Sequence, residues 1–519
     1  MLRKTMKISE KSIEWSIKHL VRHSDTDLFP RPVEFGALED MLDSAVAKLK
    51  DVDLGNYNFG PARRFIVPKD EVSYRTATQL DPLDSIFFTA IVYEYGRLIE
   101  SRRVPKHEGK VFAYRFSPNS EFQLYASEPS WREFWLQCQT KAKNHSQIVY
   151  IDIADFYNQI YHHTLENQLA TCGFHNQLQK WLLNLLGNVT AKISRGIPIG
   201  PHATHLLAEM SLMPVDNSLR MRGLDFCRYS DDIVIFCNDY QSARIILNNM
   251  AEILYSQQLV AQRQKTKIYT SDTFVEHCNQ MLEDRPINKA EADILKILRH
   301  HAENLYVQLS LSDLSPTELK AFSSDKVNAI LTEYLESEQP NYARLRWLLR
   351  RLSQIQAPSA VEFCVDHIND LTPAISDLCR YLASVSDDYE GDWKKLGDAI
   401  FEMLQDELIK SNEYFQVSLL SIFTRHPALD QTNRFVPLYK SSSDGLKREI
   451  LLSAYLLELG DWIREIKQSY ASLDPWSRRA FLIAAKLLPL DERRFFLDQI
   501  KSLSMLEELL VKWARSKYQ

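Results

Sequence analysis

The stretch at residues 224–236, LDFCRYSDDIVIF, places two adjacent acids, Asp231 and Asp232, between two short apolar runs. Such runs around a polar centre predict a strand, a tight turn and a second strand. The turn would then present two carboxylates at the tip of a hydrophobic hairpin. Asp is also a common turn residue for backbone reasons alone, so a purely structural role stays open on this stretch by itself.

A third acid, Asp152, interrupts the apolar run at residues 148–153, IVYIDI. A carboxylate in the middle of such a strand is costly to bury unless it is paired or binds a metal. A helical stretch then runs to residue 169, so Asp152 ends a strand at the point where the chain turns into a helix. That position suits a ligand that points into a cleft.

Two further segments carry features that are ambiguous by themselves. The turn at residues 195–201, RGIPIGP, combines two glycines that allow unusual backbone angles with two prolines that fix others, and a predicted helix over 203–215 follows. It is either a strand-to-helix connection or a backbone platform against which a base or sugar packs. Upstream, a predicted strand at 63–69 is bracketed by cations. Lys69 and Arg75 there either hold a triphosphate or lie at a solvated sheet edge.

The composition fits a soluble protein of two or more domains. At 519 residues the chain is longer than one core usually holds, and its 45% apolar and 25% charged content is ordinary. A net charge of −6 argues against an avid non-specific nucleic-acid binder, which usually has a basic footprint. The seven cysteines are scattered without zinc-finger spacing, so we expect a reducing compartment. We expect no signal peptide and no membrane span, because no apolar run is suitable.

From residue 286 onward the sequence predicts helix after helix. The segment SPTE at residues 315–318 is a capping box with Pro at the first helical position. Apolar stripes recur at helical spacing, without a strict repeat period. We therefore predict a mixed α+β domain over residues 1–285, followed by an all-α domain over residues 286–519 that forms an irregular HEAT-like solenoid.

Taken together and in this order, the motifs resemble those of a reverse transcriptase, a palm-type polymerase related to those of retroviruses, retrons and group II introns. The four blocks are DIADFY at residues 152–157, the glycine turn at 196–201, YSDD at 229–232 and Lys265-Thr266. The resemblance covers roughly residues 60–275 and implies fingers and a palm within residues 1–285. The fingers would occupy roughly residues 1–147 and 165–195, and the palm the rest.

The resemblance implies that the acids bind two divalent metal ions, which are Mg²⁺ or a substitute such as Mn²⁺. Nucleotide addition needs two such ions between the attacking oxygen and the leaving pyrophosphate, and Mg²⁺ takes hard oxygen ligands. Asp152 and Asp231 match the two metal-bridging acids of the family. Asp232 matches the adjacent acid nearer the primer end, and the carbonyl of Ile153 would complete the ligand set.

Five more positions match family residues that contact the nucleotide. Tyr157 matches an aromatic residue that abuts the sugar and excludes a 2′-hydroxyl, which implies a preference for dNTPs; otherwise it is a core aromatic. Lys265 matches a lysine near the leaving pyrophosphate and is a candidate general acid, or else a surface lysine. Lys69 and Arg75 match finger cations that hold the triphosphate. Gly200 belongs to the platform beside the incoming nucleotide.

One position departs from the family pattern. Many reverse transcriptases have Gln before the second glycine of the glycine turn, where this chain has Ile199. An isoleucine side chain cannot hydrogen-bond beside the incoming nucleotide and its template partner. The departure puts ordinary template-directed copying in doubt.

A reverse transcriptase with a helical-repeat tail resembles the abortive-infection (Abi) reverse transcriptases of bacteria, and the length and compact N-terminus look most like the prophage-carried type. The resemblance implies a cytoplasmic enzyme of phage defence, assembled as a homo-oligomer, a trimer or hexamer. It also implies single-stranded DNA synthesis from dNTPs without a template, primed by a protein tyrosine, for which Tyr57 is our candidate. Two alternatives stay open: a templated reverse transcriptase with a bound RNA, and an inactive polymerase-like scaffold that binds partners.

Overall fold

The computed structural model describes residues 6–24, 27–126, 130–282, 286–301, 311–337, 340–385 and 389–516. The chain forms two compact units. Unit 1 comprises Met1–Thr26, Leu42–Arg63 and Thr78–Arg285, and unit 2 comprises Asp27–Met41, Arg64–Ala77 and Pro286–Gln519. Both units are therefore built from more than one segment of the chain.

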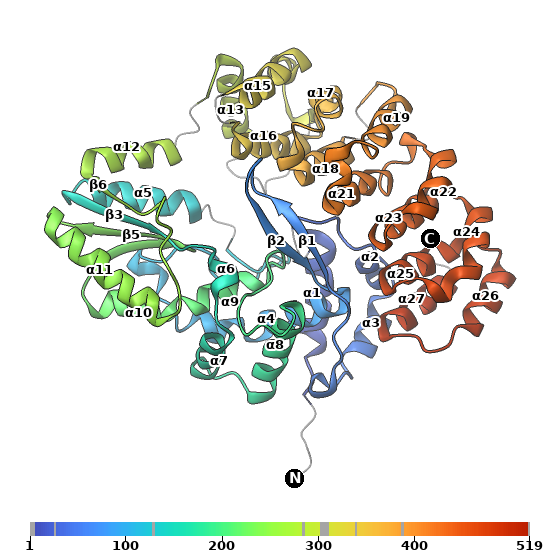
Figure 1. Cartoon of the computed structure of the whole chain (residues 1–519), viewed down its shortest axis with the longest axis horizontal. Coiled ribbons are helices and arrows are strands. Elements are labelled where there is room, and N and C mark those ends of the chain that lie inside the picture. Colours follow the sequence, from blue (N-terminus) through green and yellow to red (C-terminus); the bar gives the residue numbers. More distant parts are fainter. Residues whose placement is uncertain are drawn as a thin grey trace, which may run out of the picture. The chain divides into compact units, whose positions relative to one another are not determined.

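Unit 1 is organised around a four-stranded antiparallel sheet with the strand order β4-β5-β3-β6 (Figure 1). The strands are β3 (Gln147–Asp152), β4 (Asp225–Tyr229), β5 (Asp232–Cys237) and β6 (Lys267–Thr270). The predicted strand at 148–153 and the predicted hairpin around the adjacent acids are both present. The apolar runs form strands because their side chains are buried on both faces of the sheet.

Helices cover both faces of this sheet. In Figure 1, α5 (Ser130–Ala142) and α12 (Ser271–Leu282) lie on one face, while α10 (Met213–Met221) and α11 (Tyr240–Ser256) lie on the other. One core cluster joins the first face to its helices; it comprises Phe134, Trp135, Cys138, Ala142, Ile148, Cys227, Val234, Phe236, Phe274 and Cys278. The sheet is therefore a rigid base for the residues at its strand ends.

Further helices of unit 1 pack mainly on one another. They include α1 (Glu10–His23), α3 (Leu42–Leu49), α4 (Pro82–Glu100), α6 (Phe156–Gln159), α7 (His162–Thr171), α8 (Asn176–Val189) and α9 (Thr204–Ser211). The prediction of a single helix over residues 203–215 is wrong in one respect, because the structure has two helices there: α9 ends and α10 begins around Leu212. Pro214 explains the break: it has no backbone N–H to continue α9, but it fits the first turn of α10.

Unit 2 takes in two segments that precede residue 78. The prediction of one domain over residues 1–285 does not anticipate this. Residues 36–50 have the apolar spacing of one amphipathic helix, but they belong to two helices, α2 (Glu34–Asp40) and α3. The backbone leaves the helical region at Met41, with φ −123° and ψ 39°. The physical reason is that α2 has its partners in unit 2, where Asp40 accepts a hydrogen bond from the indole of Trp513 at 2.8 Å.

The β1–β2 ribbon is the second of these segments. The two strands β1 (Arg63–Pro68) and β2 (Tyr74–Gln79) form a two-stranded sheet, and most of its residues belong to unit 2. We predicted β1 but not β2. The alternating β-branched residues of YRTATQ were the available signal for a strand.

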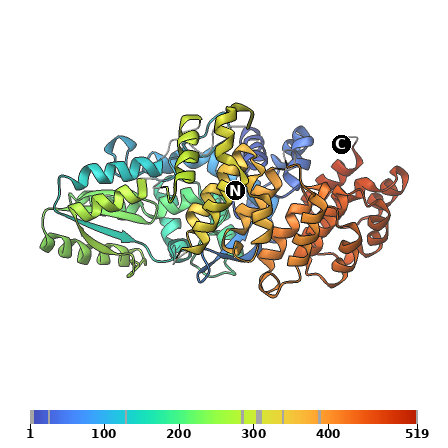
Figure 2. The same ribbon diagram turned by 90° about the horizontal axis from the view of Figure 1, so that it is seen from above.

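The rest of unit 2 is helical, as predicted. Helices α16 (Tyr342–Ile355), α18 (Ile375–Ser384), α21 (Glu413–Phe423), α23 (Asp444–Leu456), α25 (Pro475–Ala484) and α27 (Met505–Arg515) each pack on the next one in this series. A second set of helices flanks the series (Figure 1), and the orange-to-red helices stand side by side in Figure 2. This set includes α13 (Lys289–His301), α15 (Ser324–Glu336), α17 (Val361–Asp366), α19 (Trp393–Met403), α22 (Thr432–Ser441), α24 (Gly460–Ile466) and α26 (Leu490–Gln499).

Local signals account for several of these helix boundaries. The predicted capping box is present at α14 (Pro316–Leu319), where the hydroxyl of Ser315 accepts from the Glu318 N–H and the Glu318 carboxylate accepts from the Ser315 N–H. Asp474 likewise caps α25, which begins at Pro475. Within the described ranges, no helix combines the length and apolarity that a membrane crossing requires.

Candidate active site

Three acids meet at one end of the unit 1 sheet. Asp152 is the last residue of β3 and Asp232 is the first residue of β5, and their Cα atoms are partners in the antiparallel register. Asp231 lies in the turn between β4 and β5, where its carbonyl accepts a hydrogen bond from the N–H of Ile153 at 3.2 Å. The sheet thus brings together the acids that the sequence separates, as we predicted.

The turn that carries Asp231 has an unusual backbone. Ser230 adopts the left-handed region with φ 53°, although it is not a glycine. Its carbonyl accepts a hydrogen bond from the guanidinium of Arg228 at 2.9 Å. A residue held in this conformation is a feature of functional turns, where the surrounding structure offsets the cost.

A buried ion network lies behind the turn. Arg228 is fully buried and binds Asp216 through two hydrogen bonds of 2.7 Å, and it also donates to both oxygens of Glu209. Arg103 donates to Glu209 as well, at 2.6 Å. Burial lowers the pKa of Arg228, but the charges of Asp216 and Glu209 outweigh it and raise the pKa overall, so the guanidinium stays charged. We did not predict this residue, although a cation in an apolar strand is as costly as Asp152 and was the signal to use.

The acids repel one another electrostatically. Burial, together with the charge of Asp152, raises the pKa of Asp231. Burial also raises the pKa of Asp232 to about 7, and the charges of Asp231 and Asp152 add to that effect, while a hydrogen bond from Tyr150 opposes it. Carboxylates that resist ionisation in this way form a site that favours the binding of cations.

Lys265 is the cation nearest to this group in the structure. Its ammonium donates to Oδ2 of Asp152 at 2.7 Å, and its side chain is 62% exposed. Partial burial lowers the pKa of Lys265, but the hydrogen bond to Asp152 and the negative charge of the three acids raise it overall. Lys265 is therefore protonated at neutral pH and lies beside the acids, as the general-acid prediction requires.

The acids suit a hard divalent cation by their chemistry. Carboxylate and carbonyl oxygens are the ligands that Mg²⁺ prefers, and Asp152, Asp231, Asp232 and the Ile153 carbonyl supply only oxygen. In the part of the chain that the structure describes, no three His, Cys, Asp or Glu side chains are arranged as a metal site. Two of the acids have protein partners, because Asp152 is paired with Lys265 and Asp232 accepts a hydrogen bond from Tyr150.

The predicted sugar-contacting residue lies against the glycine turn. The carbonyl of Tyr157, on α6, accepts a hydrogen bond from the N–H of Ile197 at 2.9 Å. Gly196 and Gly200 have φ values of 93° and 136°, which L-residues rarely adopt, so both glycines are required by the turn. Burial raises the pKa of the Tyr157 phenol well above its usual range, and the charge of Asp231 is among the smaller causes. Tyr157 and the turn of Gly200 are thus brought together near the acids.

Ile199 provides no polar side chain at the glycine turn. Its carbonyl accepts a hydrogen bond from the N–H of Thr78 at 2.8 Å, and its side chain is half-buried. The polar contact that Gln makes in many family members therefore has no counterpart at this residue.

Lys69 and Arg75 belong to the β1–β2 ribbon in unit 2. Lys69 is exposed, and its carbonyl accepts from the guanidinium of Arg346 at 2.7 Å. Arg75 is half-buried and lies near Tyr414, since its charge lowers the pKa of that phenol, which burial raises overall. The acids lie in unit 1, so the triphosphate-binding role of these two cations stays a prediction.

Tyr57 is a poor candidate for a reactive tyrosine. Its hydroxyl donates to Oδ1 of Asp84 at 2.7 Å, and its ring packs edge-on against Phe59 and Phe87. Tyr57 was our candidate because it lies in a loop rich in Gly and Asn, where a mobile side chain is expected. In the structure, the buried carboxylate of Asp84 and an aromatic cluster hold this tyrosine in place.

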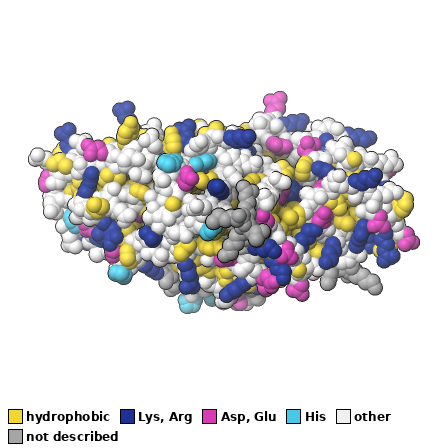
Figure 3. All heavy atoms as spheres, turned by 90° about the horizontal axis from the view of Figure 1, so that it is seen from below, with side chains coloured by type: hydrophobic (Ala, Val, Ile, Leu, Met, Phe, Trp, Pro, Cys, Tyr) yellow, Lys and Arg dark blue, Asp and Glu magenta, His cyan; other side chains and the backbone are white. Residues whose placement is uncertain are grey.

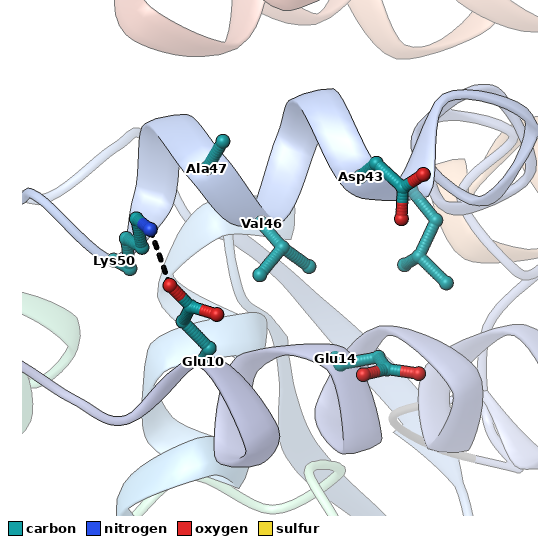
Figure 4. A pocket seen from close by; sticks show the side chains of 7 residues that line it. Glu10, Glu14, Asp43, Val46, Ala47 and Lys50 are labelled. Atoms are coloured by element: carbon teal, nitrogen blue, oxygen red, sulfur yellow. Dashed lines mark hydrogen bonds and ion pairs between the residues drawn. The ribbon is translucent and has the colours of Figure 1, made fainter.

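A separate hollow of about 250 Å³ lies between α1 and α3. Figure 4 shows its lining, which comprises Glu10, Glu14, Leu42, Asp43, Val46, Ala47 and Lys50. Lys50 is paired there with Glu10. The hollow contains none of the predicted catalytic residues, and its three carboxylates do not suit a phosphate.

Comparison with known proteins agrees with this geometry. Residues 99–342 match the family model described as reverse transcriptase (RNA-dependent DNA polymerase). The match contains the three acids, Tyr157, the glycine turn and Lys265, and it extends through the first helices of unit 2 to the start of α16. Residues 99–342 are therefore similar to a reverse-transcriptase domain. No curated protein matches the chain.

One solved structure gives a distant likeness. It is a telomerase from Candida albicans in complex with a fragment of telomeric RNA, 12% identical in sequence with a TM-score of 0.30. The alignment covers 70% of this chain and 65% of that one. A likeness at this level carries no argument about the present chain.

Proposed function

We propose that the chain is a nucleotidyltransferase of the reverse-transcriptase family that joins dNTPs into DNA. The register of β3 and β5 carries the proposal, because it pairs Asp152 with Asp232 and places both beside Asp231 within the matched family range. Burial and the neighbouring acids raise the pKa of Asp231 and of Asp232, so the group needs a counter-charge. An inactive scaffold would not require three carboxylates close together, so the cluster of acids argues against the scaffold alternative.

Two Mg²⁺ ions, held by Asp152, Asp231, Asp232 and the Ile153 carbonyl, would neutralise the charge that develops on the transferred phosphate. The chain's own residues perform the other tasks. Protonated Lys265 beside Asp152 donates a proton toward the leaving pyrophosphate.

The nucleotide itself is held by residues around the acids. The ring of Tyr157 packs against the sugar and leaves no room for a 2′-hydroxyl. The glycine turn, with Gly200, provides a backbone surface beneath the nucleotide, and Lys69 and Arg75 hold its triphosphate. These roles are carried over from the family pattern at matching positions.

We further propose that synthesis needs no template. A duplex of template and primer requires matching cations for its phosphates, but the chain has a net charge of −6. On the face seen in Figure 3, Lys and Arg side chains are spread among Asp and Glu rather than gathered into one basic patch. Ile199 also lacks the polar group expected beside a templated base pair.

The acceptor hydroxyl for the first nucleotide is proposed to be a tyrosine of the chain. Its phenol oxygen bonds to the α-phosphorus, the bond to the β-phosphate oxygen breaks, pyrophosphate leaves and the phenol proton passes to solvent. Among the described residues, Tyr74, Tyr240 and Tyr255 have exposed rings, with Tyr255 the most exposed at 73%. They replace Tyr57 as candidates.

The cellular role follows the resemblance to the Abi group. We propose that the protein acts in abortive infection, in the bacterial cytoplasm, as a homo-oligomer of three or six copies. The long helical part of unit 2 is the proposed surface for contacts between copies or with a partner. Its sequence pattern is that of HEAT-like repeats. The proposed activity and the proposed role are separate and are tested separately.

The decisive experiment incubates the purified protein with labelled dNTPs and Mg²⁺ in the absence of nucleic acid. We expect labelled DNA of random sequence that remains attached to the protein after denaturation and maps by mass spectrometry to a tyrosine. Product that appears only with an added RNA template would favour the conventional enzyme. No product under any condition would favour the scaffold.

A further inference from the structure

A hydrogen bond fixes the outer end of the Tyr157 side chain. Its hydroxyl and Nδ1 of His205, on α9, share a hydrogen bond of 2.6 Å. The two rings meet edge to face, with centroids 6.0 Å apart and an angle of 81°. The inner end is fixed as well, because the Tyr157 carbonyl accepts from the Ile197 N–H. The ring is therefore held at both ends.

His205 is itself held in place. Its ring stacks on Tyr114 with a centroid distance of 4.0 Å and an angle of 8°. The carbonyl of Tyr114 accepts from the buried guanidinium of Arg103 at 2.9 Å. The hydroxyl of Tyr125 donates to the His202 carbonyl at 2.7 Å and accepts from the Leu206 N–H at 3.2 Å, which ties down the backbone around His205. These contacts fix His205 independently of Tyr157, so His205 can hold the Tyr157 ring in place.

We infer that His205 is the positioning residue that gives Tyr157 its power to discriminate between deoxyribonucleoside and ribonucleoside triphosphates. The inference rests on the proposed function. A ring can exclude a single hydroxyl only while it is held in place, because a displaced ring makes room for one more oxygen atom. Without the hydrogen bond, the Tyr157 side chain gains torsional freedom, so its ring can move aside and a 2′-hydroxyl can be accommodated.

The size of the effect follows from the bond that is lost. A side-chain hydrogen bond contributes about 0.5–1.5 kcal/mol, which corresponds to roughly a two- to tenfold change. We therefore expect a two- to tenfold loss of discrimination when the bond is removed. Tyr157→Ala removes the whole ring and should give a larger loss of discrimination. It defines the largest change that the assay can show.

The test measures kcat/KM for one dNTP and the matching rNTP, each with Mg²⁺, in the full chain. His205→Phe keeps a stacked ring but removes Nδ1, and we expect the rNTP/dNTP ratio of kcat/KM to rise two- to tenfold. His205→Asn places a hydrogen-bonding atom near the position of Nδ1 and should restore most of the discrimination. Tyr157→Phe removes the same bond from the other side and should give the same rise.

A double variant separates this role from a general loss of packing. Because His205→Phe and Tyr157→Phe remove one bond, the pair together should change the ratio no more than either alone. Tyr334→Phe is the matched control, since it removes a buried tyrosine hydroxyl that binds Glu291 in unit 2. It should leave the ratio unchanged.

The outcomes distinguish the inference from the proposed function. An unchanged ratio in His205→Phe, with normal dNTP incorporation, would overturn the inference and leave the polymerase assignment intact. Failure of the unaltered protein to incorporate any nucleotide would overturn the proposed function. Should His205→Phe not fold, Tyr157→Phe decides: a raised ratio supports the inference, and an unchanged ratio refutes it.

Discussion

Asp231 lies in a turn, where burial and the charge of Asp152 raise its pKa although hydrogen bonds from its own backbone and from Ser230 oppose this. We therefore look for its role in chemistry. Asp231→Asn should abolish nucleotide incorporation, because an amide cannot replace the charge that holds a metal ion. The fold should persist, since the side chain lies at a hairpin tip. Incorporation assays and circular dichroism of the variant check both points. Retained incorporation with Mg²⁺ would refute the metal assignment.

Asp232 is expected to reduce stability when no metal is present. Its pKa is about 7 in the folded protein and 3.8 when unfolded, so the folded state favours the protonated form. The protonated carboxyl group of Asp232 stabilises the fold fully below about pH 4. This contribution to the free energy of unfolding is lost as the pH rises to about 7. Asp232→Asn mimics the protonated acid, so with EDTA at pH 8 the variant should melt at a higher temperature than the unaltered protein. The gain should shrink at pH 5.5.

Asp239→Asn is the control for this measurement. Asp239 caps α11, and its hydrogen bonds with Ser242 lower its pKa, so its charge stabilises the fold. Its replacement should not raise the melting temperature at pH 8. Added Mg²⁺ should stabilise the unaltered protein more than Asp232→Asn. Equal melting temperatures for the unaltered protein and Asp232→Asn at pH 8 would show that the carboxylate is not strained.

At the scale of residues, the sequence identified the acids because Asp152 interrupts an apolar run, and Asp231 and Asp232 lie between two such runs. That reasoning depends only on neighbours along the chain. His205 and Tyr150 were missed because their significance lies in contacts with Tyr157 and Asp232, residues at least 48 positions away. Such contacts arise only when helices and strands have assembled.

At the scale of elements, the glycine turn shows how much a local sequence determines. Gly196 has a φ of 93°, where an added Cβ would also approach the Asn158 carbonyl at 3.5 Å. Gly196→Ala should therefore reduce the free energy of unfolding by about 1–2 kcal/mol, and displace the turn that binds the Tyr157 carbonyl. Urea unfolding measures the first effect, and dNTP KM the second.

Gly187→Ala gives a control of opposite sign. Gly187 lies within α8, and an added Cβ would meet no atom within 4 Å. Alanine there should stabilise the protein by about 0.5–1 kcal/mol, because it restricts the unfolded chain and favours the helix. If both variants shift stability in the same direction, backbone strain at Gly196 is not the cause.

The elements that the sequence predicted correctly have strong periodicity or strong boundaries. The YSDD hairpin, β3 and the capped α14 are examples. The breaks at Met41 and Leu212 were missed because apolar periodicity continues across them, and the first break depends on which unit each helix packs against. β2 was missed because polar Thr and Gln residues weaken its apolar pattern.

At the scale of the whole molecule, the assembly state remains a prediction. The helices of unit 2 form a series in which each packs on the next, and most soluble oligomers close by point symmetry. We expect light scattering at micromolar concentration to give a mass three or six times that of the 60.4 kDa chain. A monomer mass would contradict this prediction without affecting the proposed chemistry.

The interleaving of the chain in unit 2 could not be predicted, because it joins residues hundreds of positions apart. Glu34 of α2 accepts two hydrogen bonds, at 2.9 and 2.8 Å, from Arg448 of α23, and both side chains are buried. Burial raises the pKa of Glu34, but the charges of Arg448 and Arg479 lower it overall. The pair therefore stabilises unit 2 above about pH 4.5 and loses this contribution as the pH falls below it.

Arg448→Met should consequently reduce the free energy of unfolding by about 3–5 kcal/mol, because it removes both hydrogen bonds to the buried Glu34 and leaves only the more distant Arg479, at 3.9 Å, beside it. Glu34→Met combined with Arg448→Met should recover most of that loss, since two apolar side chains then face each other. Arg464→Met, which breaks an exposed pair with Glu492, should cost less than about 1 kcal/mol. Urea unfolding at pH 7 compares the three variants. If Arg448→Met costs no more than Arg464→Met, α2 is not anchored in unit 2 through this pair, and the interleaved arrangement must be held by its apolar contacts alone.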